Sequence, residues 1–539
     1  MKVISFGILL VINLFLRSVQ CENLKLLILH NNDMHSRFEE TSRTSGTCKD
    51  KSNCYGGFGR VLHVVREARK AAADGTGPPV LFLNAGDTYT GTSWFSVHKW
   101  RIAADFMNLL QPDVACFGNH EFGYKPSGLS PYLKAIRFPM LACNVDFSEE
   151  PELQYFDLQK SWIFNVDGRS IGVIGYVTTT SADMGFVGKI KFLDEIPAVT
   201  AESRRLAEGG IKTIIALGHS GFEMDKRIAR EVPLVDLVIG GHTNTLLCNG
   251  IRPDIEQCAG SYPTIVTQPG GKKVPVVQAY AYTKYLGRLN VTIDDDGRIV
   301  EYSGYPQLLD AHIPQDPAAI ALLDRFRKEI DAAASKIVGY STSVLGGEIK
   351  KCRYEECTLA NLVTDAFDSS YGSNAYAMIG AKSLYHDIIP KKNGSITLLD
   401  LLNAFPFAGN VYSVQLTGLH IWKTLEIGVR SNGETTGSEF VHTSGIRYKF
   451  NMTKPTGQRV VELKVLVDGQ TWQNIDYSAI YQIVTTQLMI DGADRHKVFA
   501  VKGRNITQLP FNDTEILLRY FKKHSPVTVN LDGRVERVG

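Results

Sequence analysis

Side chains that bind divalent metals recur in five short stretches of the chain, and each stretch follows a short apolar run. In chain order, these side chains are Asp33, His35, Asp87, Asn119, His120, His219, His242 and Asn244. Their mixture of nitrogen and oxygen donors suits zinc, manganese or cobalt, and it is too rich in nitrogen for a calcium cage. One such residue after a strand is more often a turn, a helix cap or a structural histidine. Five stretches together predict the site of a two-metal hydrolase.

The apolar runs predict how these side chains are positioned. LKLLILH before Asp33 and TIIALG before His219 have the length and composition of buried strands. From Leu24 to about Ala311, such runs alternate with amphipathic segments typical of helices. Loops at the carboxyl ends of several strands meet in one crevice of an α/β sheet. We therefore expect a layered α/β domain with the site along its strand ends.

The spacing of the residues also indicates their roles. Two neighbouring cations need a bridging carboxylate, and Asp87 is the candidate because it stands alone after its strand. Asp33 and His35 are alternate residues at a strand end, so both can reach one metal. The other metal would be held by Asn119, His219 and His242. His120 is placed to stabilise the transition state or to protonate the leaving oxygen. The alternative is a partner of the ligands with no role in proton transfer.

At 539 residues the chain is too long for a single core. Between Pro317 and Gly339 apolar residues recur at helical spacing, which predicts a helix joining two domains. These residues are Ile320, Leu323, Phe326, Ile330, Ala333 and Ile337. We predict a first domain over 22–313, a linker helix over 314–338 and a second, α+β domain over 339–539.

The N-terminus and the cysteines indicate an extracellular protein. Residues 1–21 contain a lysine and the run VISFGILLVINLFL, which is typical of a secretory signal peptide. Cys116 and Cys143 lie in apolar runs, and we expect buried thiols there. Close spacing predicts disulfides, as expected in an oxidising compartment, between Cys48 and Cys54, Cys248 and Cys258, and Cys352 and Cys357. Glycosylation sequons begin at Asn290, Asn393, Asn451, Asn505 and Asn512.

Charge and hydropathy argue against two classes of partner. The net charge is +2, and Lys and Arg do not gather in a stripe, so nucleic acid is not expected as a partner. After the predicted signal peptide no stretch is long and apolar enough to cross a bilayer. The C-terminal segment HSPVTVNLDGRVERVG lacks the hydrophobic tail of a lipid-anchor signal. We therefore expect no membrane anchor.

The motifs ILHNNDMHSR, NAGDTYTGT, FGNHEFG, ALGHSGFEMDK and GGHTNT resemble those of the 5′-nucleotidase family and occur in its order. The resemblance spans essentially the whole mature chain. It implies a four-layer calcineurin-like metallophosphatase domain, a connecting helix and a C-terminal nucleoside-binding domain. It also implies two divalent ions, with zinc the first expectation and magnesium, calcium, manganese or cobalt the alternatives. It places Asp33, His35 and Asp87 on one ion with Asn244 nearby, Asp87, Asn119, His219 and His242 on the other, and His120 at the phosphate.

In the C-terminal half the resemblance is looser, and it implies three substrate-binding residues. Arg353 lies inside the small disulfide loop CRYEEC, and Phe407 in AFPFAGNVY fits one of two aromatic side chains that enclose the base. Asp494 fits an acid that contacts the ribose. The alternative is that Phe407 and Asp494 are ordinary packing and capping residues.

This half also departs from the family pattern. Leu488 stands at the second aromatic position, which forfeits roughly 0.5–1.5 kcal/mol of ring stacking. Gly380 and Tyr385 stand where relatives have an asparagine and an arginine, and Lys382 offers charge without the fork geometry of arginine. Gly123 stands where relatives often have the aspartate that orients the histidine. We expect intact metal chemistry with an altered grip on the nucleotide.

The resemblance implies a secreted, metal-dependent nucleotide phosphohydrolase, and three interpretations of its function stay open. The first is an apyrase that cleaves ATP and ADP, as salivary members from blood-feeding arthropods do to suppress platelet aggregation. The second is a 5′-nucleotidase that cleaves AMP. The third is a catalytically weak member that inhibits platelets by binding a host platelet receptor. No Arg-Gly-Asp or Lys-Gly-Asp tripeptide occurs, and the retained metal ligands favour an enzyme.

Overall fold

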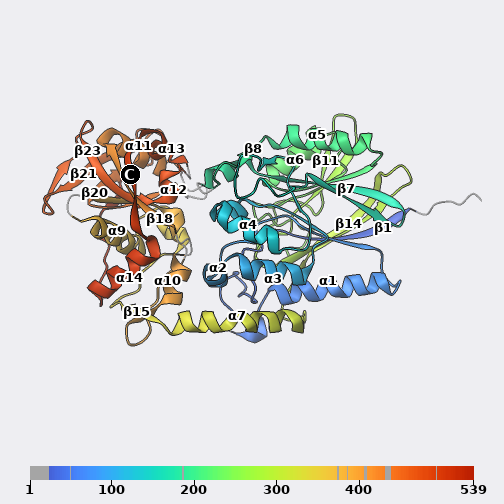
Figure 1. The fold of residues 1–539 in the computed structure, drawn as a ribbon, viewed down its shortest axis with the longest axis horizontal. Helices are drawn as coiled ribbons and strands as arrows, with labels where there is room; N and C mark the ends of the chain where they lie inside the picture. Colours follow the sequence, from blue (N-terminus) through green and yellow to red (C-terminus); the bar gives the residue numbers. More distant parts are fainter. Residues whose placement is uncertain are drawn as a thin grey trace, which may run out of the picture.

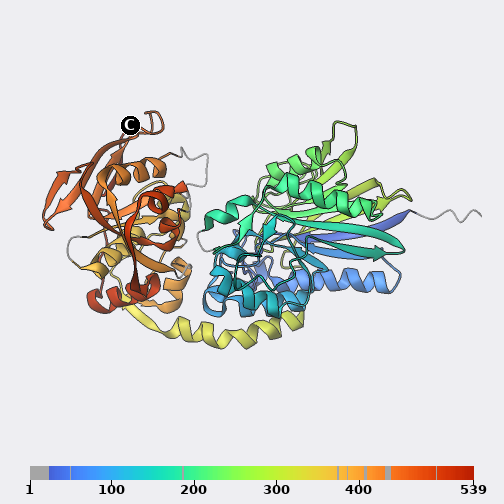
Figure 2. The same cartoon turned by 45° about the horizontal axis from the view of Figure 1, so that its top comes forward.

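The computed structural model describes two lobes joined by helix α7 (Pro317–Ser335), which runs along one side of the molecule in Figures 1 and 2. The described residues are 23–48, 50–184, 187–372, 375–384, 386–405, 409–430, 439–492 and 495–539. The predicted signal peptide at 1–21 lies outside them, as do Tyr385, Phe407 and Asp494.

Two six-stranded sheets form the centre of the N-terminal lobe within the described part of the chain. The first sheet, in spatial order, contains β14 (Ile299–Leu308), β13 (Tyr285–Ile293), β1 (Leu24–Asn31), β2 (Val80–Asn84), β3 (Val114–Cys116) and β4 (Met140–Leu141). The second contains β11 (Thr264–Thr267), β12 (Lys273–Val277), β10 (Leu237–Ile239), β9 (Thr213–His219), β7 (Arg169–Val177) and β6 (Ser161–Val166). Strands β1 to β4 run parallel to one another, and so do β7, β9, β10 and β12.

The two sheets pack face to face, with helices on both outer sides. The core between the sheets includes Ile28 and Leu83 from the first sheet and Leu217 and Ile239 from the second. One outer layer consists of α1 (Phe58–Ala73), α2 (Ser93–His98), α3 (Trp100–Leu110) and α4 (Lys125–Ala135). The other consists of α5 (Glu195–Glu208) and α6 (Phe222–Glu231). Every residue of β9 is buried because both faces of this parallel strand are covered, which explains its continuous apolar sequence. The expected four-layer fold is confirmed.

The C-terminal lobe is a mixed α+β unit, as expected. Its five-stranded sheet has the order β19 (Val441–Ser444), β16 (Tyr376–Gly380), β23 (Ile480–Thr486), β18 (Asn410–Thr417) and β24 (Arg504–Asn512). A second sheet contains β22 (Thr471–Asn474), β21 (Val460–Val467), β20 (Ile446–Phe450) and β25 (Val535–Arg537). The helices are α8 (Ile349–Cys352), α9 (Thr358–Tyr371), α10 (Leu398–Ala404), α11 (Gly418–Gly428), α12 (Gln487–Ile490), α13 (Lys497–Lys502) and α14 (Asp513–His524).

The linker helix is shorter than the sequence predicts. Lys336 has extended backbone angles that end α7, and β15 (Ile337–Tyr340) then pairs with β17 (Ser395–Thr397) of the C-terminal lobe. The helical spacing predicts a buried face that includes Ile320 and Ile337, but both are exposed, and Leu322 is buried instead. Helix α7 packs on α1, α2 and α3 and also contacts α10. The helix is therefore attached mainly to the N-terminal lobe, and the chain changes lobe just after it.

The three predicted disulfides are confirmed, between Cys48 and Cys54, Cys248 and Cys258, and Cys352 and Cys357. Cys116 and Cys143 are buried free thiols, as expected. Among the described residues, no helix combines the length and the apolar composition needed to span a bilayer.

Candidate metal centre

The predicted ligands come from loops at the ends of five strands, three in one sheet and two in the other. Asp33 and His35 follow β1, Asp87 follows β2, and Asn119 follows β3 within the short 3-10 helix η2 (Asn119–Phe122). In the second sheet, His219 is the last residue of β9, while His242 and Asn244 follow β10. Because the parallel strands of each sheet end at the same edge, these loops meet above the interface between the two sheets.

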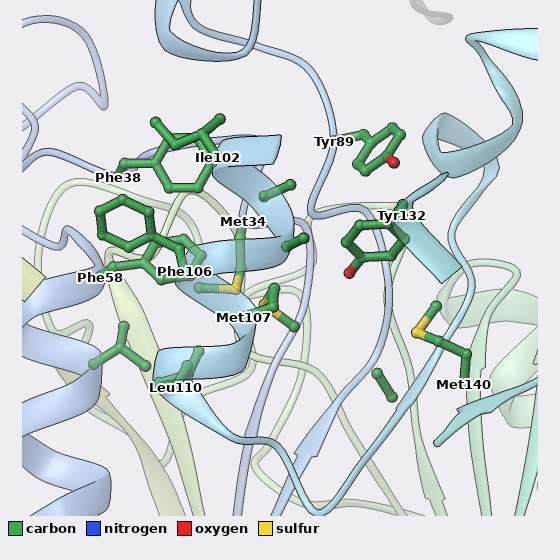
Figure 3. Close-up of a cluster of buried hydrophobic side chains, with 14 of the residues drawn as sticks. Met34, Phe38, Phe58, Tyr89, Ile102, Phe106, Met107, Leu110, Tyr132 and Met140 are labelled. Atoms are coloured by element: carbon green, nitrogen blue, oxygen red, sulfur yellow. The ribbon is translucent and has the colours of Figure 1, made fainter. Parts of the chain in front are cut away.

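Two buried side chains anchor the loops that carry the acids. Met34 lies between Asp33 and His35 in the chain, and Figure 3 shows its side chain among the residues of the core beside α3. Tyr89, two residues after Asp87, packs against Phe95 and Tyr132, with ring centroids 4.6 and 5.1 Å apart. Both anchors are fully buried. Functional and core residues therefore alternate along each loop, which holds the ligands rigidly.

Five predicted ligands have a left-handed backbone: Asp33, His35, Asp87, His242 and Asn244, with φ between 46° and 78°. Non-glycine residues rarely adopt this conformation, which costs free energy and is concentrated at functional sites. The strain is a second indication, independent of side-chain chemistry, that these turns serve the site.

The acids and imidazoles converge on Asp87. His219 Nε2 lies 3.0 Å and His35 Nε2 3.6 Å from Asp87 Oδ2. The same nitrogens lie 3.8 and 3.7 Å from Asp33 Oδ1. Two groups of side chains have donor atoms close enough to hold an ion, one with Asp33, Asp87 and His219, the other with His35, Asp87 and His120. Asp87 belongs to both groups, which is the geometry a bridging carboxylate requires.

The remaining predicted ligands border this cluster. The backbone N–H of His242 donates to Asp33 Oδ2 at 2.9 Å, and its ring lies 5.2 Å from that of His219. Asn244 Nδ2 donates to the Tyr282 hydroxyl at 3.3 Å, and Asn119 is buried in η2. Asn244 Oδ1 is buried and makes no hydrogen bond. Buried polar atoms are normally paired, so this oxygen fits coordination of a metal.

The electrostatics also fit a cation site. Burial alone would lower the pKa of His219, but Asp87 and Asp33 outweigh it and raise the pKa to about 10. Burial opposes ionisation of Asp33 and Asp87, yet the imidazoles hold the pKa of both carboxyls below the ordinary value. The two acids thus favour positive charge between them. A divalent ion would displace the imidazole protons, because histidine binds metal in its neutral form.

Glu121, in the FGNHEFG motif, has a role that the sequence reasoning missed. Its buried carboxylate accepts hydrogen bonds from four backbone N–H groups, those of Asp87, Thr88, Tyr89 and Gly118, at 2.7–3.0 Å. It therefore joins the loop after β2 to the loop after β3. The sequence signal for this role was an acid three residues after Gly118, at the end of a predicted strand. The sequence alone does not reveal that its carboxylate binds backbone amides.

Asn32 is a second missed residue, on the loop after β1. Its Nδ2 donates to Asp33 Oδ2 at 2.7 Å and to the Tyr280 carbonyl, and its Oδ1 accepts from Ala279 N–H at 3.0 Å. It ties the loop after β1 to the segment after β12. Strand β12 ends at Val277, just before this segment. Tyr280 and Tyr282 then have positive φ and turn the chain toward the site.

Arg353 and Lys382 of the C-terminal lobe are near enough to the metal centre for their charges to act on its side chains. Burial raises the pKa of Tyr282, and the positive charges of Arg37 and Arg353 oppose that rise. Burial lowers the pKa of His120 to about 3 and that of His242 to about 4, and the charge of Lys382 acts in the same direction on both.

A small cavity of about 150 Å³ lies between the lobes. Leu488 and Ser383 line it from the C-terminal lobe, and Gly123 and Tyr124 line it from the other. Leu488 is thus at the lobe interface, while the other predicted base and ribose contacts, Phe407 and Asp494, lie outside the described residues.

Comparison with known proteins agrees with this geometry. Residues 26–245 match the calcineurin-like phosphoesterase family, and residues 337–501 match the C-terminal domain of 5′-nucleotidases. Protein 5NUC of Lutzomyia longipalpis is 39% identical over 96% of this chain and 93% of its own length. The chain belongs to the 5′-nucleotidase family. The 5′-nucleotidase of Homo sapiens is 35% identical over 95% of this chain and 91% of its own length.

A solved structure extends the comparison to the fold. The crystal structure of a 5′-nucleotidase precursor from Thermus thermophilus has a TM-score of 0.78 and 30% identity. The match covers 96% of this chain and all of that one. The protein is therefore a metal-dependent phosphohydrolase, and its calcineurin-like fold implies a site for two divalent ions.

Proposed function

We propose that this member of the 5′-nucleotidase family is a secreted enzyme that removes the terminal phosphate of ATP and ADP. The proposal is supported by two cationic side chains of the C-terminal lobe, Arg353 and Lys382, whose charges act on Tyr282 and His120 beside the metal centre. A phosphate chain carries more negative charge than a single phosphate, and cations placed beside the reacting phosphate stabilise that excess.

Seven residues would hold the two ions, with zinc as the metal we expect from the mixed nitrogen and oxygen donors. They are Asp33, His35, Asp87, Asn119, His219, His242 and Asn244. When bound, the ions would polarise the phosphoryl oxygens and lower the pKa of a bound water. Asp87 would bridge the ions, since its Oδ2 lies 3.0 Å from Nε2 of His219 and 3.6 Å from Nε2 of His35.

His120 would act on the phosphate rather than on the ions. Its Nε2 lies 4.0 Å from Asp87 Oδ2, so the imidazole borders the space where a phosphoryl group would lie. From there it could donate a hydrogen bond to the phosphoryl oxygens or a proton to the leaving oxygen. Arg353 would contact the outer part of the substrate, together with Phe407 and Asp494 at the nucleoside.

Hydrolysis of AMP is the second candidate, and the names of the relatives favour it. Against it stands Leu488, because a leucine at the lobe interface lacks the stacking energy of an aromatic ring. AMP has only one phosphate through which to bind, so it depends more on its base than ADP or ATP does.

The test is phosphate release from ATP, ADP and AMP in parallel, with and without EDTA. We expect EDTA-sensitive release from ATP and ADP and little from AMP. D87A should abolish release, whereas D296A, at an exposed turn after β13, should not. Release from AMP at a rate equal to that from ADP would favour the second candidate, and no release from any nucleotide by the metal-loaded protein would refute the proposal.

A further inference from the structure

Thr90 occupies an unfavourable backbone conformation in the loop that carries Asp87. Its φ is 63°, in the left-handed region, and its side chain is 3% exposed. A β-branched residue is a genuine outlier there, whereas glycine or asparagine would be accommodated more easily. Backbone strain of this kind is concentrated at functional sites, so the contact made by this buried hydroxyl is a candidate functional contact.

The Thr90 hydroxyl lies 3.2 Å from Nδ1 of His120. The opposite nitrogen of the ring, Nε2, is on the side of the metal centre, 4.0 Å from Asp87 Oδ2. The His120 backbone N–H donates to Asp87 Oδ1 at 2.9 Å, and the ring packs edge-on against His35 with centroids 5.0 Å apart. The Thr90 contact is therefore positioned to set the rotation of the ring and the direction of Nε2.

Two neighbouring positions do not supply this contact. The oxygens of Glu121 accept hydrogen bonds from four backbone amides, and Gly123 has no side chain. A hydroxyl differs from a carboxylate because it can both donate and accept. It can therefore bind Nδ1 whether or not that nitrogen carries a proton, and it adds no negative charge that would stabilise an imidazolium.

We propose that Thr90 is the positioning residue for His120 and that its hydroxyl aims Nε2 at the reacting phosphate. The proposal rests on the function proposed above insofar as His120 acts on phosphate. The hydroxyl of Thr90 contacts the ring of His120, so its effect passes through the imidazole.

The test compares T90V, which removes the hydroxyl and keeps the shape, with T90S, which keeps the hydroxyl. T213V is the matched control, because Thr213 is equally buried and its hydroxyl donates to the Gly297 carbonyl at the far end of β9. We expect T90V to lower kcat for the best nucleotide about three- to tenfold with KM nearly unchanged. T90S should retain most of kcat, and T213V should leave it unchanged.

A second measurement does not depend on turnover. In ¹H–¹⁵N spectra of protein labelled at histidine, with the His120 signals assigned by their loss in H120N, T90V should move the His120 ring signals and T90S should restore them. An unchanged His120 signal in T90V refutes the proposal, as does a kcat loss that T90S does not restore or that T213V shares. If wild type releases no phosphate while T90V still moves the His120 signal, the proposed function fails and the positioning role stands.

Discussion

The replacement of Glu121 by glutamine tests the link between the two loops most sharply. Each carboxylate oxygen accepts two backbone N–H groups: Oε2 those of Asp87 and Gly118, and Oε1 those of Thr88 and Tyr89. In E121Q one oxygen becomes an NH₂ group that faces two donors, so two buried amides lose their acceptor. At roughly 1–3 kcal/mol for each unsatisfied group, the cost is about 2–6 kcal/mol.

One effect opposes this loss. Burial raises the pKa of Glu121, and the nearby charge of Asp87 raises it further, so the neutral glutamine relieves some repulsion. We therefore expect E121Q to lower the free energy of unfolding of the N-terminal lobe by roughly 2–4 kcal/mol. Because the bonded loop includes Asp87, displacement by about 1 Å would also reduce kcat on the order of a hundredfold.

The assay is urea unfolding of the metal-free protein together with phosphate release by the metal-loaded protein. E223Q is the control, since Glu223 is 86% exposed on α6, and a change there should stay within about 0.5 kcal/mol. An E121Q variant that unfolds like wild type and turns over at the wild-type rate would refute the proposed role of this carboxylate.

A buried acid, the metal centre and a disulfide loop at the lobe interface can each be tested separately. Burial raises the pKa of Asp225 to about 7, above its ordinary value of 3.8. The stability that this group contributes is therefore full below pH 3.8 and is lost as the pH rises toward 7. The unfolding free energy of D225N should vary less with pH over that range, and an unchanged slope would contradict this. Zinc at a hundredfold excess over its dissociation constant should stabilise the protein by about 2.7 kcal/mol, measured as an EDTA-reversible rise in Tm, and equal Tm values would argue against the site. Replacement of Cys352 and Cys357 by serine opens the small loop that contains Arg353. We expect this change to raise KM for ADP and to leave hydrolysis of p-nitrophenyl phosphate unchanged. Equal losses on both substrates would show that the loop acts on the fold instead.

The sequence predicted the elements of the N-terminal lobe well because its parallel strands are buried on both faces and appear as continuous apolar runs. The polar residues after Leu29 and Gly218 marked the strand ends, so candidate ligands could be named from the sequence. Sequence periodicity gave the wrong secondary structure where contacts between distant segments determine it. Ile337 continues a helical pattern, yet it lies in β15 because that segment pairs with β17 of the other lobe. The segment after Val277 is apolar like the strand before it, but it turns toward the site because Tyr280 and Tyr282 have positive φ.

Side-chain roles that depend on backbone amides could not be predicted at all. Glu121 was visible only as an acid beside a histidine, and its four amide partners come from two different loops. Thr90 was visible only as a residue in a polar turn, because neither its positive φ nor its contact with His120 has a sequence signal.

Stepwise metal reconstitution is the most direct test of whether hydrolysis depends on two ions held around Asp87. Protein stripped with EDTA would be titrated with Zn²⁺ while phosphate release from ADP and bound metal are both measured. We expect no release from the stripped protein and a rise that levels off at two bound ions per chain. Release by the stripped protein, or full activity with one ion bound, would contradict a two-ion mechanism.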